Sequence, residues 1–190
     1  EYKIEAGFDA ASDSVDLEEA YISYVGWDPA ELTVGKFKMP YSLEEQTSSR
    51  FISFLERGNN NVFAPGKNLG GGVSFGGDNY GVSVAYMFAG DLVDGSDDGF
   101  EEDNGIVARA TVAPMFDKKG GSLLHLGLSS YYLSDQDGTA RFRQRPGIHN
   151  ADRLVDTGTI ANVDDTWSIN PEVAFVAGPF SAQAEYAWTQ

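Results

Sequence analysis

The stretch SLEEQTSSRFISFLERGNNNVFAPGKNLGGG, residues 42–72, decides how the rest of the sequence is interpreted. It interrupts a series of alternating segments and is too long for a hairpin turn. Its apolar residues recur at roughly helical spacing, and Thr47–Ser49 favour the start of a helix. Long ordered loops inside strand-rich chains are usually functional, although the pattern alone also fits an ordinary surface excursion.

Alternation of apolar and polar residues marks nine segments, three before this stretch and six after it. In the first, Tyr2, Ile4, Ala6 and Phe8 alternate with polar or small residues, the period of a strand with one apolar face. The pattern predicts antiparallel β-strands of about eight to ten residues, long enough to cross a bilayer with tilt. They are centred on residues 2–10, 19–24, 32–35, 69–75, 82–88, 106–112, 124–129, 169–175 and 180–188.

The connections between the expected strands are alternately short and long after the third strand. Short turns lie at 76–79, 116–121 and 178–179, and long loops at 39–67, 91–104 and 134–165; the short turn at 12–14 is the exception. Outer-membrane barrels alternate in this way, with an apolar face toward lipid and a polar face toward the lumen. A soluble β-sandwich that binds a partner remains an alternative, because it can show the same alternation by chance.

Composition restricts the class of protein further. The 190 residues are enough for one domain, and 29 acidic against 13 basic residues give a net charge of −16, which argues against nucleic-acid binding. Cysteine is absent, so there is no disulfide framework. No apolar run approaches the roughly 20 residues of a membrane-spanning helix. Both ends fall inside expected strands, so we expect a fragment of a longer protein.

Four blocks of the sequence carry a family resemblance. They are GKFKMPYSLEEQTSSRFISFLER (35–57), VFAPGKNLGGGVSF (62–75), ARFRQRPGIHNADRLVDTGTI (140–160) and EVAFVAGPFSAQAEY (172–186). In order and spacing they resemble the phosphate-selective porin O and P family of Gram-negative outer membranes. The resemblance implies that residues 1–190 form part of one all-β, antiparallel, trimeric transmembrane barrel of roughly 16 strands. It also implies that the loop at 39–67 folds inward and constricts the pore.

Three arginines alternate in RFRQR: Arg141, Arg143 and Arg145. In an extended segment their guanidinium groups point the same way and offer successive bidentate sites for an oxyanion such as phosphate. The pattern alone favours a solvated edge. The resemblance instead implies that the loop at 134–165 contributes an arginine ladder, which Arg153 extends.

Basic residues also cluster around the 39–67 loop. The resemblance places Arg50, the basic residue after Thr-Ser-Ser, at the constriction. Arg57 is expected to hold the shape of the loop by pairing with Glu56 or Glu44, a role that we weigh equally with anion binding.

Three further basic residues lie in expected strands. Lys36 and Lys38 lie on the side opposite Phe37, and we expect them to line the lumen. Arg109 lies on the polar face of its strand, because an arginine on a lipid face near the midplane costs about 2–4 kcal/mol.

Other chemistry finds little support. Seven acidic residues in the thirteen from Asp91 to Asp103 lack the spacing of an EF-hand loop and favour a solvated loop. His125 and His149 are the only histidines and have no metal-ligand pattern around them. His125 is expected in the lumen rather than as a base. We therefore expect no enzyme activity, metal or cofactor.

The sequence thus predicts an anion-selective outer-membrane porin that passes phosphate or similar anions by passive diffusion. Its expected partners are those anions, outer-membrane lipid and two further copies of itself. A general or differently selective porin is the first alternative, because the acidic surplus fits an anion pore poorly; a soluble binding module is the second.

Overall fold

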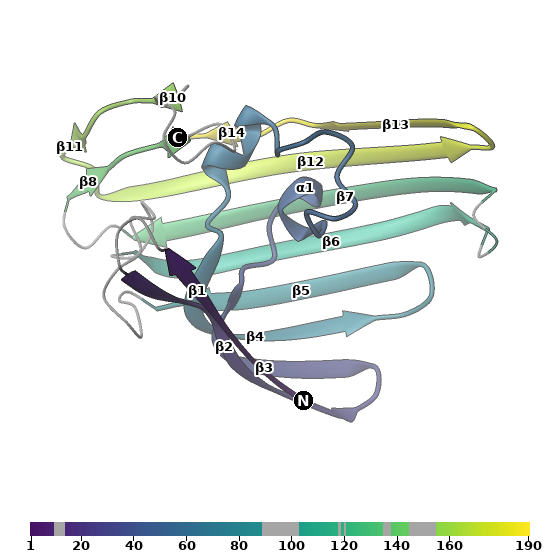
Figure 1. Cartoon of the computed structure of the whole chain (residues 1–190), viewed down its shortest axis with the longest axis horizontal. Helices are drawn as coiled ribbons and strands as arrows, with labels where there is room; N and C mark the ends of the chain where they lie inside the picture. The colour runs from purple at the N-terminus through teal and green to yellow at the C-terminus, as the bar shows by residue number, and fades with distance from the viewer. Residues whose placement is uncertain (10–13, 89–102, 118, 120, 135–137, 145–154) are drawn as a thin grey trace.

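The computed structural model describes residues 1–9, 14–88, 103–117, 119, 121–134, 138–144 and 155–190. Ten strands form one antiparallel sheet, and all but the last lie across it in chain order (Figure 1). They are β1 (Tyr2–Asp9), β2 (Ser14–Trp27), β3 (Ala30–Lys38), β4 (Lys67–Gly76), β5 (Tyr80–Met87), β6 (Asn104–Phe116), β7 (Ser122–Ser134), β12 (Asp165–Ala177), β13 (Phe180–Glu185) and β14 (Trp188–Thr189).

The order along the sheet is β1-β2-β3-β4-β5-β6-β7-β12-β13, and β14 also pairs with β12. This confirms the predicted antiparallel meander. The long strands β2, β6, β7 and β12 have 13 or 14 residues, more than the predicted length. In the described part of the chain β1 and β13 end the sheet without pairing with each other, as expected for a piece of a barrel.

Four short strands lie in the connection between β7 and β12. They are β8 (Thr139–Ala140), β9 (Arg143–Gln144), β10 (Val155–Asp156) and β11 (Ile160–Ala161). β9 pairs with β10 and β8 pairs with β11, so this connection folds back on itself as two small ribbons. The sequence pattern did not predict these four strands.

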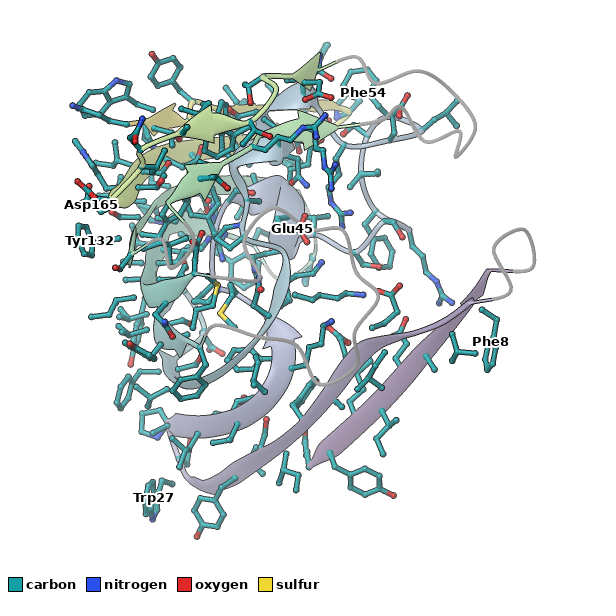
Figure 2. The ribbon with its side chains drawn as sticks, turned by 90° about the vertical axis from the view of Figure 1, so that its left-hand side faces the viewer. Phe8, Trp27, Glu45, Phe54, Tyr132 and Asp165 are labelled. Atoms are coloured by element: carbon teal, nitrogen blue, oxygen red, sulfur yellow. The ribbon has the colours of Figure 1, made fainter. Side chains whose placement is uncertain are left out.

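The two faces of the sheet differ in chemistry, as the alternation predicted. Register partners such as Val82, Ala110 and Leu128 share the outer face, which is apolar and exposed. Its exposed members on β3, β5, β6, β7 and β12 include Val34, Val84, Ile106, Leu126, Val173 and Phe175. Seen from one end, the sheet curves around Glu45, whereas Trp27 and Tyr132 point away from the concave side (Figure 2).

The inner face holds an apolar cluster beside a band of polar residues. The cluster consists of Met39, Tyr41, Ala85, Met87, Val107, Tyr131 and Leu133. The buried polar residues of the inner face include Ser23, Ser129, Ser168, Asn170 and Glu172. Buried polar groups need hydrogen-bond partners, and the loop that crosses this face supplies many of them.

That loop contains α1 (Leu43–Gln46) and the 3₁₀ helix η1 (Asn59–Phe63). α1 begins after Ser42, whose hydroxyl accepts the Glu45 N–H. The helix expected after Thr47–Ser49 is wrong, because residues 48–56 form turns and bends. The apolar side chains of these residues are exposed and do not form the buried apolar face that stabilises an amphipathic helix.

None of the helices in the described residues is long and apolar enough to cross a membrane.

Candidate functional site

The inward loop, residues 39–66, is fixed to the concave face by its first part, the loop root (residues 39–46). The Tyr41 hydroxyl shares a 2.6 Å hydrogen bond with Ser168 Oγ on β12, and its ring packs on Tyr131 with centroids 5.2 Å apart. The Ser42 N–H donates to Ser129 Oγ on β7 at 3.0 Å. Burial raises the pKa of the Tyr41 hydroxyl to about 12, against the opposing effect of the Ser168 hydrogen bond.

Glu185, on β13, holds the start of α1. Its two carboxylate oxygens accept the N–H groups of Leu43 at 2.9 Å and Glu44 at 2.8 Å. The first N–H groups of a helix have no partner within the helix, so a carboxylate placed there satisfies them and favours this position. Asn170 Nδ2 donates to the same carboxylate at 3.0 Å. Figure 1 shows α1 in front of β7 and β12, as these contacts require.

The returning part of the loop has a second attachment to the same strands. Asn60, in η1, donates through Nδ2 to Asn170 Oδ1 at 3.3 Å and accepts the Ala187 N–H at 3.2 Å. The loop is therefore tied to β12 and to the segment around β13 at two places.

Glu45 is buried at the centre of the loop root and collects several donors. Its carboxylate lies 3.1 Å from Lys38 Nζ, 3.6 Å from Arg57 Nε and 2.8 Å from Asn61 Nδ2. A buried carboxylate is tolerated only with such partners. Glu45 thus joins the end of β3 to both halves of the inward loop.

Arg57 holds parts of the inward loop together. Its guanidinium donates to the carbonyl oxygens of Glu44 at 3.0 Å and Thr47 at 3.1 Å, besides its ion pair with Glu45. The Glu44 carboxylate accepts the Gly58 N–H at 2.9 Å. The Glu45 carboxylate thus pairs with Arg57, and Glu44 contributes its carbonyl oxygen.

A charged cavity of about 630 Å³ opens between the inward loop and β1–β3. Its charged lining comprises the cations Lys3, Lys38, Arg50, Arg57 and Lys67 and the acids Glu5, Glu19 and Glu45. Gln46, Ser48 and Ser49 add polar groups. Five cations against three acids leave a local excess of two positive charges, although the chain as a whole is strongly acidic.

Most of these cations are committed to acids. Lys3 pairs with Glu5 and Glu19 across β1 and β2, and Lys67 lies 2.7 Å from Glu18. Arg50 differs from them. It is exposed, and among the described residues its guanidinium makes no ion pair; only its backbone N–H has a contact, to Ser48 Oγ at 3.5 Å.

The two lysines of β3 are placed differently. Lys38 lines the charged cavity and donates to the Glu45 carbonyl at 2.6 Å. Phe37 packs on the inner cluster and against Tyr21. Lys36 is only 5% exposed and does not line the cavity.

Arg109, on β6, lies on the inner face as expected, but it is held by an acid that the sequence did not single out. Its Nη2 and Nε donate to Glu172 Oε1 and Oε2 at 2.5 and 3.2 Å. His125 Nε2 lies 2.7 Å from Glu172 Oε1, so both basic side chains meet one carboxylate on β12.

The predicted arginine ladder is only partly described. Arg141 makes a bidentate ion pair with Asp156 at 2.9 and 2.7 Å, and this hydrogen bonding raises the pKa of Arg141 above its ordinary value. Arg143 belongs to β9, opposite Asp156 in the register. Arg145, Arg153 and most of the acidic run from Asp91 to Asp103 lie outside the described residues.

In the described ranges, no group of three or more His, Asp or Glu side chains is arranged to hold a metal ion. Sequence reasoning missed Glu45, Glu172 and Glu185. Ser42-Leu-Glu-Glu45 matches the capping-box pattern and could have located α1 and its buried acid. Nothing local marks Glu172 or Glu185, because their partners lie far away along the chain.

The fold and the charged cavity define a class: a β-sheet wall with a lipid-type outer face and a loop that crosses its inner side, as in outer-membrane porins. A family model described as phosphate-selective porin O and P matches residues 1–190. The chain is 30% identical to Porin O of Pseudomonas aeruginosa, over 98% of this chain and 48% of that protein. It is 29% identical to an uncharacterized protein of Caulobacter vibrioides, over 98% of this chain and 39% of that protein.

The chain belongs to the phosphate-selective porin O and P family, whose members are porins of the Gram-negative outer membrane. It spans about half or less of the length of these two curated relatives.

Proposed function

We propose that the complete protein is an anion-selective pore through which phosphate or related anions diffuse passively. The observation that carries the proposal is Arg50, a cation of the charged cavity whose guanidinium makes no ion pair among the described residues. A guanidinium that no carboxylate occupies keeps its bidentate donors for a passing oxyanion. The family description, phosphate-selective porin O and P, supports the same ligand class.

The acidic composition does not oppose this proposal. Ions in a narrow passage respond to the charges that line it, and the cavity lining carries an excess of positive charge. Transient binding suits the task, since an ion must be held strongly enough to enter and weakly enough to leave. Passage requires no covalent step, so the proposal assigns no catalytic residue.

A porin with little phosphate preference is the second candidate. It is favoured by the ion pairs of Lys3, Lys38, Arg57 and Lys67, which leave the cavity with fewer available donors than its cation count suggests. The pore would then sort solutes mainly by size.

The test is electrical and uses the full-length protein in planar bilayers. In a potassium chloride gradient, the sign of the zero-current potential reports whether anions or cations pass more readily. We expect anion preference, together with block of chloride current by added phosphate. Anion preference without phosphate block supports the second candidate, and cation preference overturns the proposal.

We also propose that three copies assemble, as the family resemblance implies. Chemical cross-linking of the full-length protein in outer membranes is expected to give a trimer band. A cross-linked product that stops at the dimer would contradict this assembly.

A further inference from the structure

Glu172 is a carboxylate buried in the inner wall, outside the charged cavity. Its side chain has 0% exposure, whereas those of Arg109 and His125, which cover it, have 17% and 18%. Arg109 uses two nitrogens and His125 one to reach it. Arg109 and His125 thus cover the Glu172 carboxylate, and their own side chains remain partly exposed.

The position of this group matters because it borders the loop root. Arg109 is the register partner of Ser129, and the Ser129 hydroxyl receives the Ser42 N–H of the loop root. Glu172 lies two residue pairs further toward the short turns, opposite Gly127 on β7. The Arg109–Glu172 pair therefore lies on the short-turn side of the loop root.

The backbone around Glu172 is shaped to keep its carboxylate there. A Cβ at position 127 would collide with Glu172 Oε1, so glycine at this position leaves the space that the carboxylate fills. Across the register on the other side is Glu185, whose own carboxylate is occupied by Leu43, Glu44 and Asn170. Glu185 therefore does not replace Glu172 as the partner of Arg109.

We infer that Glu172 is a specificity-determining residue that limits how strongly this part of the wall binds anions; the inference rests on the proposed function. A carboxylate and an oxyanion compete for the same donors of a guanidinium. With Glu172 in place, Arg109 and its acid sum to zero charge, and two of the guanidinium nitrogens are already used. The pair keeps the exit from the loop root weakly attractive, which lets an anion leave.

This role predicts opposite effects from the two halves of the pair. Glu172→Gln keeps the shape and removes the negative charge, so Arg109 gains an uncompensated positive charge. We expect phosphate to block chloride current at a concentration about three- to tenfold lower, since a tenfold change corresponds to a modest difference in binding free energy. Arg109→Gln removes the guanidinium and leaves His125 beside Glu172, and we expect a similar change in the opposite direction.

The double variant Arg109→Gln/Glu172→Gln is the matched control. It restores neutrality, so we expect phosphate block within about twofold of the unmodified pore. Each variant is first checked for folding by its heat-dependent migration on gels. If Glu172→Gln does not fold, the comparison of Arg109→Gln with the double variant tests the same effect of the Glu172 charge. We then expect phosphate to block chloride current more weakly in Arg109→Gln than in the double variant.

Effects of both single variants in the same direction, or no change in any variant, overturn the inference and leave Glu172 as a structural residue only. These outcomes differ from failure of the proposed function, which shows in the unmodified pore as cation preference. The measurement uses the full-length protein with inorganic phosphate as the probe.

Discussion

The two parts of the inward loop differ in how they are held. The loop root is buried against β7 and β12 and tied down through Tyr41, Ser42 and the Glu185 carboxylate. The loop crest, residues 47–57, is mostly exposed and carries Arg50, Phe51 and Phe54 on its surface. Figure 2 places Phe54 well away from Glu45, which lies inside the curve of the sheet.

The difference suggests a division of tasks within one loop. Side chains of the loop root form their hydrogen bonds with the sheet. They hold the loop in place and have few donors left for solutes. The crest has few such contacts, and its cation Arg50 is available. A fixed loop root and an available cation on the loop crest together favour selective passage of anions without slow release of the bound anion.

Replacing Arg50 should break this division most strongly. Arg50→Glu changes the local charge by two units at an available donor, so we expect the anion-to-cation permeability ratio to fall by about tenfold or more. The measurement is the zero-current potential of the full-length pore in a salt gradient. Arg50→Lys keeps the charge and should retain most of the preference.

Lys119→Glu is the matched control for charge, because it makes the same change on an exposed turn between β6 and β7. It should leave the potential nearly unchanged. If Arg50→Glu behaves like Lys119→Glu, the crest does not set selectivity.

Releasing the root should have the next largest effect. Glu185→Ala removes the acceptor of two loop N–H groups and of Asn170 Nδ2, and hydrogen bonds to charged groups contribute about 1.5–3 kcal/mol each before solvent screening is discounted. We expect a larger and noisier single-channel conductance, because α1 no longer keeps its place. Gln183→Ala, on the same face of β13, should leave the conductance as it is; equal effects of the two variants would contradict the anchoring role.

Glu45→Gln tests the charge of the root rather than its attachment. The substitution leaves Lys38 and Arg57 without their carboxylate, so we expect anion preference to rise by about two- to threefold, opposite in sign to Arg50→Glu. Glu44→Gln removes a neighbouring acid that does not line the cavity and should change the preference by less than half as much. A fall in anion preference would show that Glu45 acts through shape alone.

The sequence was sufficient for the sheet and for the existence of the loop. Strand alternation is local, so residues such as Val82 and Val84 reveal their face without knowledge of any partner. The capping pattern at Ser42–Glu45 was also visible, and only the competing signal at Thr47–Ser49 led to the wrong helix.

The pairing of charges could not be predicted in the same way. Arg109 meets Glu172 across 63 residues, and Glu185 meets Leu43 across 142. Such contacts depend on the curvature of the sheet and on where the loop lies. A list of basic residues therefore overstates how many are available to anions, as the ion pair of Arg141 with Asp156 illustrates.

The smallest effect is expected at Tyr41, whose hydroxyl makes one buried hydrogen bond to the wall. Tyr41→Phe removes the bond to Ser168 and keeps the ring against Tyr131, so we expect a loss of about 1 kcal/mol in the free energy of unfolding at pH 8. The pKa of Tyr41 rises from its ordinary value of 10.0 to about 12 on folding, so its contribution is complete below pH 10 and is lost as pH rises through 12. The difference between wild type and variant should therefore shrink between pH 10 and pH 12. Urea unfolding followed by tryptophan fluorescence at pH 8 and pH 11 measures it, with Tyr86→Phe on the outer face as the control. A difference that is unchanged or larger at pH 11 would mean that the Tyr41 hydroxyl is not buried on folding, and no difference at pH 8 would mean that its hydrogen bond does not anchor the root.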